Sequence, residues 1–232
     1  MTTCAYLNAG VVMINFPGKL LPAGCEDDVV NSLLLAQLAL CDDHSDPSDL
    51  VAKERCSQEF LQKFCWIVES TEHRETERTA AFNIVDLLST ECEKKFKPAV
   101  ASQFLRLFSE LKTTRPTKRA FSVWQGRVVA KAEVQLDVLD GYLTVEESQV
   151  CVKFAVLGTG PEFYTLTMSF VTHSALIPDF LNQEVMTAAN KSVVLEAKSY
   201  TLNAHAYKDY RKLIAERVKG KKKEYVMAWG TA

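Results

Sequence analysis

The histidines are the side chains of this sequence with the widest chemical range, but their spacing builds no familiar site. They are His44, His73, His173 and His205, and none belongs to an H-E-x-x-H pair or a related metal-binding pattern. His173 lies between Thr172 and Ser174, but no G-x-S-x-G sequence is present to make a serine a nucleophile. We therefore predict no catalytic site, no cofactor and no metal. A dispersed active site stays open as an alternative, with His173, Asp137 or Cys151 coupled in a deep pocket.

The number and spacing of the cysteines also argue against a disulfide or metal site. The chain has seven of them, an odd number without a C-x-x-C pair, which speaks against a disulfide framework and against a zinc ribbon. Most fall in segments with helical periodicity, where a free cysteine packs as a small apolar side chain. We predict reduced, structural thiols.

One glycine-containing stretch has a second interpretation. Val152 to Gly160, V-K-F-A-V-L-G-T-G, resembles a strand followed by the first glycines of a dinucleotide fold. The third glycine of that pattern is replaced by Phe163, and the residues that follow alternate as in a strand. The glycines therefore predict a hairpin turn.

The C-terminal part is strongly basic. Residues 205–223 hold eight lysines and arginines against two acidic residues, whereas the whole chain has a formal net charge of −2. Such a segment suits anionic lipid headgroups, nucleic acid or plain solvent around a terminal helix. Nucleic acid is disfavoured because no recognised aromatic stacking motif is interleaved with the charges. The candidate basic surface is Arg211, Lys212, Lys219, Lys221, Lys222 and Lys223.

Length and composition bound the class of protein. A chain of 232 residues can bury a large core without disulfides, and 47% hydrophobic with 24% charged residues is typical of a globular protein. The apolar run from Val29 to Leu40 is interrupted by polar residues and is shorter than the roughly 18 residues of a spanning helix. No basic segment precedes Val11, so we expect no signal peptide, and synthesis in the cytoplasm with any release by another route.

The second half of the chain alternates with the period of strands. Apolar side chains occupy every second position from Val128 to Val138 and again from Tyr164 to Phe170, with polar residues between them. Val150 to Val156 and Ser192 to Leu202 predict two more strands, and Asp140-Gly141 predicts a hairpin turn. Ala175 to Asn190 is either a helix or a long connection. Short turns between successive strands imply antiparallel pairing.

The first half predicts a short strand and then four amphipathic helices. The strand is Val11 to Phe16. The helices begin near Glu26, at Asp46-Pro47 with apolar positions reaching Ile67 and Val68, around Ala81 to Cys92, and at Pro98 to Lys112. The mixed charges of Glu69 to Arg78 suggest a solvated helix face or a connection. Thr113 to Arg119 is predicted to be a loop within one domain, because the helices need the sheet to bury their apolar faces.

The order of these segments resembles the cytolytic delta-endotoxin family, which includes the mushroom volvatoxin and the Erwinia virulence factor. The likeness covers about Pro98 to Leu202: a helix containing P-A-V-A-S-Q-F-L-R-L-F, an aromatic strand around Phe121 to Trp124, and then C-V-K-F-A-V-L-G, F-Y-T-L-T-M-S-F-V-T and K-S-V-V-L-E-A-K-S-Y-T-L. The resemblance implies a three-layer fold with helix hairpins flanking an antiparallel sheet, no enzymatic activity, and lipid binding followed by oligomeric insertion or membrane disruption.

The sequence therefore predicts an α+β fold in one three-layer domain, with a helical part at about 26–112, a sheet part at about 120–204 and a basic segment at 205–232. The predicted function is a membrane-active, pore-forming or membrane-disrupting protein that binds anionic lipid and assembles as a homo-oligomer on the membrane. The helices would shield the strands in solution. The alternative is a soluble binding or assembly protein that uses the sheet as a scaffold and the basic tail for an acidic partner. The side chains predicted to contact lipid are Val134, Leu136, Val138, Tyr164, Leu166, Met168 and Phe170.

Overall fold

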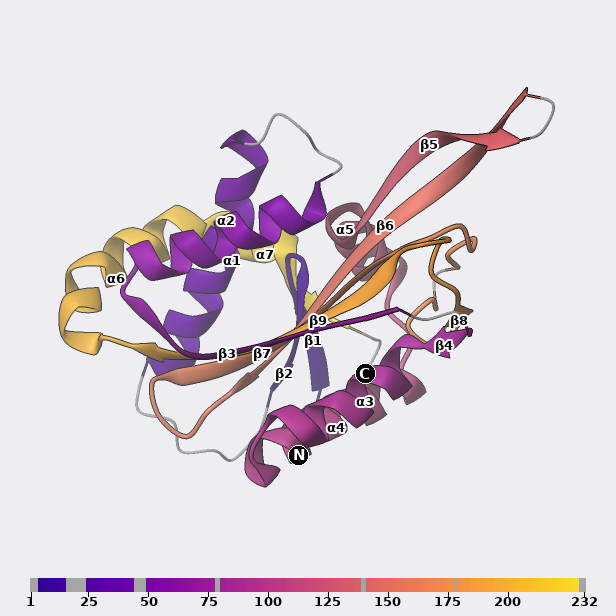
Figure 1. Ribbon diagram of the computed structural model, residues 1–232. Coiled ribbons are helices and arrows are strands. Elements are labelled where there is room, and N and C mark those ends of the chain that lie inside the picture. Colours follow the sequence, from indigo (N-terminus) through magenta and orange to yellow (C-terminus); the bar gives the residue numbers. More distant parts are fainter. Residues whose placement is uncertain are drawn as a thin grey trace.

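The computed structural model describes residues 4–15, 24–43, 49–77, 80–138, 141–177 and 179–229. Within these ranges the chain forms three layers, with a mixed β-sheet between two groups of helices (Figure 1). The α+β class predicted from the sequence is confirmed.

Seven helices and ten strands make up the described residues. The helices are α1 (Cys25–Asp43), α2 (Leu50–Lys63), α3 (Ile84–Lys95), α4 (Pro98–Thr113), α5 (Lys118–Val128), α6 (Ala204–Lys219) and α7 (Lys222–Tyr225). The strands are β1 (Cys4–Asn8), β2 (Val11–Asn15), β3 (Trp66–Glu77), β4 (Phe82–Asn83), β5 (Val129–Val138), β6 (Gly141–Leu157), β7 (Glu162–Thr172), β8 (Glu184–Val185), β9 (Ser192–Leu202) and β10 (Val226–Ala228).

Local chemistry sets the starts of the helices. The Asp49 carboxylate accepts a hydrogen bond from the Ala52 amide at 2.8 Å, and Asn83, Thr117 and Asn203 cap α3, α5 and α6 in the same way. Helix α4 instead begins with Pro98, which suits a first helical position because its missing N–H would have no partner there.

Strand β6 is the centre of the main sheet, whose order is β10-β1-β2-β6-β7-β9-β3. Its first half pairs with β5 and its second half with β2, while β7 runs along its other edge. The β2–β6 pairing is parallel and the other pairings of this sheet are antiparallel, so the predicted antiparallel sheet is corrected to a mixed one. The β5–β6 hairpin extends beyond the helical layers (Figure 1).

Each face of the sheet has its own core. Helices α3, α4 and α5 bury Leu88, Phe104 and Trp124 with the even-numbered side chains of β6. Helices α1, α2 and α6 bury Leu33, Leu61 and Ile214 near the other end of the opposite face. In Figure 1 the sheet separates these two groups of helices.

The prediction for Glu69 to Arg78 is wrong. The segment from Trp66 to Glu77 is an edge strand that pairs with β9 along its whole length, so Ile67 and Val68 belong to this strand and not to the preceding helix. Most of its charged side chains are exposed, and such charges on an edge strand discourage pairing with another chain. Helix α2 begins at Leu50; the predicted start at Asp46-Pro47 lies outside the described residues.

The aromatic stretch from Phe121 to Trp124 is a helix, not a strand. It lies in α5, where Ala120, Trp124 and Val128 recur at helical spacing and are buried. The sheet of the second half therefore begins at Val129 and not near residue 120. The division into a helical half and a sheet half is also corrected, because β1, β2 and β3 come from the first half and α6 follows the last long strand.

The C-terminal segment is more ordered than a solvated helix with a frayed end. Helix α6 is followed by α7 and by β10, which pairs with β1 at the edge of the sheet. Trp229 is only 2% exposed, and its indole N–H donates to the Thr114 carbonyl at 3.2 Å. Neither β1 nor β10 was predicted: β10 has only three residues, and β1 lacks the continuous apolar run that marks β2.

Several predicted elements are confirmed. Helices α1, α3 and α4 form as expected, β9 spans Ser192–Leu202, and residues 158–161 turn the chain between β6 and β7. Residues 175–177 and 179–191 form a connection that contains the short β8. The predicted hairpin turn at Asp140-Gly141 includes a residue outside the described ranges, although Val138 pairs with Gly141 in the flanking ladder.

Candidate functional site: a polar sheet face beneath helix α2

The strands β6, β7 and β9 present one apolar face to α3 and α4. Across this face the ladder sets Val152 beside Met168 and Met168 beside Leu195, and sets Phe154 beside Leu166. The rings of Phe154 and Phe108 meet edge to face at 5.3 Å. Since all of these side chains are at most 4% exposed, this face is a dry core.

The opposite face of the same three strands is polar at its centre. Lys153, Thr167 and Glu196 lie side by side in one row, and Thr165 and Lys198 lie side by side in the next. Lys153 and Lys198 are only 3% and 7% exposed. Strands buried between two helical layers are usually apolar on both faces, so this buried polar row is unusual.

Helix α2 supplies the partners for these charges. Glu54 forms an ion pair with Lys153 at 2.6 Å, and the side chains of the two residues are 12% and 4% exposed. Gln58, one turn further along the helix, accepts from Lys198 at 2.5 Å and donates to Glu54 at 3.1 Å and to Glu196 at 3.0 Å. Lys198 and Glu196 complete the network at 2.8 Å.

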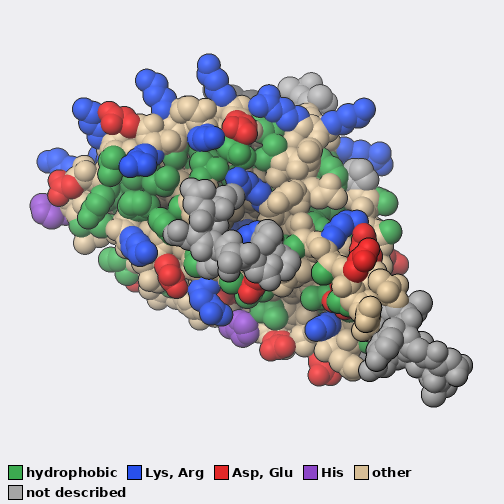
Figure 2. Space-filling view, turned by 90° about the horizontal axis from the view of Figure 1, so that it is seen from above, with side chains coloured by type: hydrophobic (Ala, Val, Ile, Leu, Met, Phe, Trp, Pro, Cys, Tyr) green, Lys and Arg blue, Asp and Glu red, His purple; other side chains and the backbone are tan. Residues whose placement is uncertain are grey.

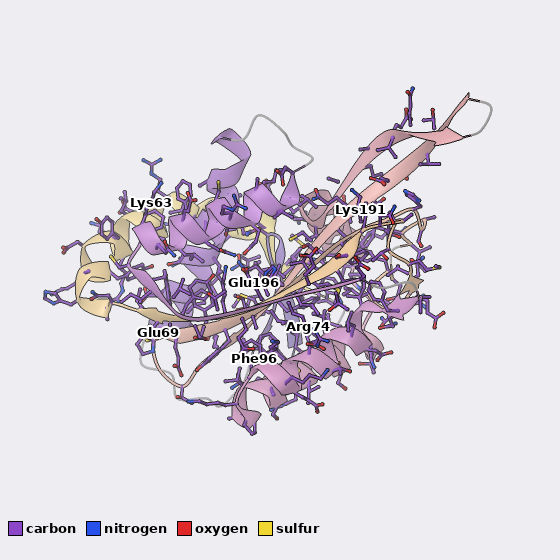
Figure 3. All side chains as sticks on the ribbon, viewed as in Figure 1. Lys63, Glu69, Arg74, Phe96, Lys191 and Glu196 are labelled. Carbon is purple, nitrogen blue, oxygen red and sulfur yellow. The ribbon has the colours of Figure 1, made fainter. Side chains whose placement is uncertain are left out.

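The network is neutral only while α2 stays in place. It holds two lysines and two glutamates, one of which comes from the helix. Removing one partner from a buried ion pair leaves an uncompensated charge, which costs roughly 3–5 kcal/mol. Figure 3 shows Glu196 on the α2 side of the sheet and Phe96 on the α3–α4 side.

Two small cavities flank this network. One, of about 70 Å³, is lined by Arg127, Lys53 and Lys153 among others, and the second, of about 180 Å³, is lined by His73, Ser169 and Glu196 among others; Cys151 borders both. The polar groups of the sheet thus have little space for a ligand larger than a few water molecules while α2 covers them.

The structure separates the cysteine and histidine that line the second cavity. His73 is on β3 and Cys151 is on β6. Three strand spacings of about 4.8 Å each separate these strands, which places the backbones of the two residues roughly 14 Å apart. Burial raises the pKa of the Cys151 thiol far above its usual range, and the nearby Glu54 carboxylate raises it further. Cys151 is therefore a protonated thiol that is separated from His73, which is the opposite of an activated nucleophile.

Of the other polar residues named for a dispersed active site, the structure places the side chain of His173. His173 is exposed at the end of β7 and lies 3.0 Å from a carboxylate oxygen of Glu147. The side chain of Asp137 is not among those that the structure describes. Among the residues that the structure describes, no group of three or more histidine, cysteine or acidic side chains is arranged to hold a metal ion.

The predicted lipid-contacting side chains fall on two different faces of the sheet. Leu166, Met168 and Phe170 are buried against α3 and α4, with the partly exposed Tyr164 on the same face. Val134 pairs with Val145, which points to the side of Lys153, so it lies on the opposite face. The side chains of Leu136 and Val138 are not among those that the structure describes. Val134 is also on the projecting hairpin, which the helices do not shield (Figure 1).

The predicted basic residues line α6 and α7. Arg211 makes a two-pronged ion pair with the buried Asp28 of α1, at 2.9 and 2.7 Å, and Lys222 meets Asp27 at 3.1 Å. Lys212 and Lys221 approach Glu216 and Glu224 only at 4.0 Å. Lys219 and Lys223 are exposed. Arg211 is thus mainly a structural anchor that fixes α6 to α1.

The solved structures that resemble this one include a delta-endotoxin and a Cyt2Ba monomer. No family model matches the sequence, and no curated protein matches it. One similar structure is that of a delta-endotoxin; it is 8% identical, the match covers 84% of this chain and 81% of the toxin chain, and the TM-score is 0.44. The other is the activated Cyt2Ba monomer from Bacillus thuringiensis subsp. israelensis, also 8% identical, with 84% of this chain and 98% of that chain covered at a TM-score of 0.42.

None of the helices in the described ranges is both long enough and apolar enough to cross a membrane.

Proposed function

We propose that this protein is a non-enzymatic, membrane-active protein that stores amphipathic strands between two helical layers and exposes them at a membrane. The observation that supports this proposal is the charged and hydroxylated centre of one face of β6, β7 and β9, which is buried under α2 although a sheet used only as a scaffold would gain stability from apolar side chains there.

The lengths of the strands fit a bilayer. Strands β7 and β9 have 11 residues each and β6 has 17, while a membrane-crossing strand needs about 9–11. In a membrane the face with Leu166 and Met168 would meet lipid, and the face with Lys153, Thr167 and Glu196 would meet water. The same alternation of apolar outside and polar inside is found in membrane barrels.

Membrane insertion also requires several copies. Backbone groups at an open sheet edge have no partners in hydrocarbon, and single-chain barrels begin at about eight strands. The three strands of this proposal, taken from one chain, cannot close such a barrel. The proposal therefore includes a homo-oligomer on the membrane, formed after the helical layers have moved away from the sheet.

Dye release tests the proposal. The purified protein is added to vesicles of anionic and of neutral phospholipid that contain a self-quenched dye, and bound protein is measured in parallel by co-sedimentation. We expect release from anionic vesicles, and faster release from Glu54→Leu, because this substitution weakens the hold of α2 on the sheet. The matched control is Asp86→Leu, which removes an exposed partner of Lys112 between α3 and α4 and should leave the release rate unchanged.

Two results would count against the proposal. Binding without release would favour a soluble binding or assembly protein with a surface anchor. If the protein neither binds to the vesicles nor releases the dye, membrane activity is excluded. Attention then turns to an acidic protein partner of the basic segment.

A further inference from the structure

The outer face of the α1–α2–α6 layer carries an apolar groove. Its volume is about 490 Å³, and Leu35, Leu38, Phe60, Phe64, Leu213 and Ile214 form most of its wall. Each of the three helices contributes to it. Figure 2 looks onto this side of the molecule and shows hydrophobic side chains gathered there, with lysines and arginines around them.

Helix α6 leaves large apolar side chains exposed beside this groove. Leu213 is 49% exposed and Tyr210 is 40% exposed, although both occupy a helix that buries Tyr207 and Ile214 on its other side. The Tyr210 ring meets the Phe64 ring of α2 edge to face at 6.1 Å, so the apolar surface is continuous across the two helices. The contact with Phe64 accounts for Tyr210, whereas about half of Leu213 remains exposed to solvent.

Basic side chains border the same surface. Arg217 follows Tyr210 and Leu213 at helical spacing and lines the groove together with Lys221. Across the groove, the Lys63 ammonium lies over the Phe60 ring at 5.0 Å from its centre. Long basic side chains can cover apolar surface with their stems and keep the charged group in water.

We infer that this groove, together with Tyr210 and Leu213, is the surface by which the protein docks on an anionic phospholipid membrane. The apolar side chains would enter the boundary between headgroups and acyl chains, and Lys63, Arg217 and Lys221 would neutralise headgroup phosphates. An anionic membrane is the partner that fits, because its negative headgroups complement the positive side chains that border the groove. The inference rests on the proposed function and specifies which face of the molecule meets the membrane first.

This placement gives α2 two roles. Phe60 and Phe64 face the groove, while Glu54 and Gln58 face the polar row of the sheet. Docking would therefore engage the helix that covers the charges of the sheet, so binding energy gained on one side of α2 is available to offset the loss of contacts on the other side.

Vesicle co-sedimentation with two variants and two controls tests this surface. Leu213→Glu should lower the partition coefficient at least about tenfold on anionic vesicles, because a leucine side chain that enters the membrane is replaced by a charge. Arg217→Gln should lower it about fivefold on anionic vesicles and leave the weak binding to neutral vesicles unchanged. The controls are Ile177→Glu, at a residue 51% exposed and outside the groove, and Lys191→Gln, at an exposed lysine outside it; both should bind as the unaltered protein does.

Circular dichroism and thermal unfolding verify that each variant is folded, and sedimentation velocity measures self-association. Equal binding of Leu213→Glu and the unaltered protein would overturn the docking surface, even if the unaltered protein releases dye. Loss of self-association in solution without loss of vesicle binding would also overturn it and assign the groove to a second copy of the chain. If the unaltered protein binds without releasing dye, only the proposed membrane disruption fails, and the docking surface is decided by the variants.

Discussion

Lys153 on the central strand β6 is neutralised by Glu54 on α2 at 2.6 Å, and the two side chains retain only 4% and 12% of their exposure. The pair ties a helix of one outer layer to the middle of the sheet. The buried charges of the sheet are neutralised only while α2 is packed against it. The position of α2 therefore connects the packing of the folded protein to the proposed release of its strands.

A double-mutant cycle should show this dependence. Glu54→Leu and Lys153→Met each leave a buried charge without its partner, so each should lower the free energy of unfolding by roughly 3–5 kcal/mol. The double variant buries neither charge and should be clearly more stable than the sum of the two losses predicts. Urea unfolding followed by circular dichroism measures all three. Additive losses would mean that the two side chains do not interact in solution.

Side chains at successive positions of β7 should alternate in their contact with lipid. A fluorescent probe attached to a cysteine at Met168 should be quenched by bromine-labelled acyl chains after membrane insertion, whereas the same probe at Ser169 should be quenched by iodide in water. Met168 is 0% exposed, so a smaller side chain there leaves a cavity and lowers stability, and both probes are therefore attached to protein that is already bound to vesicles. Equal quenching of the two sites by lipid would contradict strand insertion.

Acid should weaken the attachment of β3 to α3. Burial raises the pKa of the Glu91 carboxyl, but the hydrogen bond from Lys94 at 2.9 Å and the charge of Arg74 at 2.9 Å outweigh it, so its pKa is lower than the usual 4.5. A carboxyl with a lowered pKa stabilises the folded state above its unfolded pKa, and this contribution is lost as the pH falls through the lowered value.

Glu91→Gln should therefore remove part of the acid sensitivity. From pH 4.5 downward the free energy of unfolding should fall less steeply for this variant than for the unaltered protein. Urea unfolding at a series of pH values provides the measurement, with Glu72→Gln as a control at the more exposed partner of Lys95. Parallel pH profiles of Glu91→Gln and the unaltered protein would refute the expectation.

The buried thiols should be unreactive in the folded protein. Burial raises the pKa of Cys92 to about 12, with a further rise from Glu93, and burial also raises that of Cys151. Because the thiolate is the reactive form, iodoacetamide at pH 8 should modify neither until the protein unfolds, while the partly exposed Cys56 and Cys65 react first. Peptide mass spectrometry after timed labelling identifies the order. Rapid labelling of Cys151 at low denaturant would indicate that α2 opens locally.

Helical and strand periodicity located most of the regular elements. The apolar spacing of Ala81 to Cys92 and the alternation of Ser192 to Leu202 are local properties, and the predicted helix and strand are present there. The same patterns failed for Glu69 to Arg78 and for Phe121 to Trp124. An edge strand with charges on its exposed side chains lacks an apolar alternation, and a short aromatic segment fits either a helix or a strand until its neighbours are known.

The polar network could have been found only in part. The alternation of Thr165, Thr167 and Ser169 indicated a polar face, but the partners Glu54 and Gln58 lie on a helix about a hundred residues earlier in the chain. The docking surface was likewise hidden, since its apolar residues come from three helices that only the packed structure brings together.

The sequence by itself determined which side chains of one strand share a face, because successive residues of a strand point to opposite sides. It could not determine which faces of two strands coincide. Val134 and Leu166 each belong to an apolar set of alternating residues, yet the pairing of Val134 with Val145 and of Leu166 with Phe154 places them on opposite sides of the sheet. That relationship depends on the register between strands, and register is set by contacts across the whole fold, where a shift of one residue would exchange the two faces.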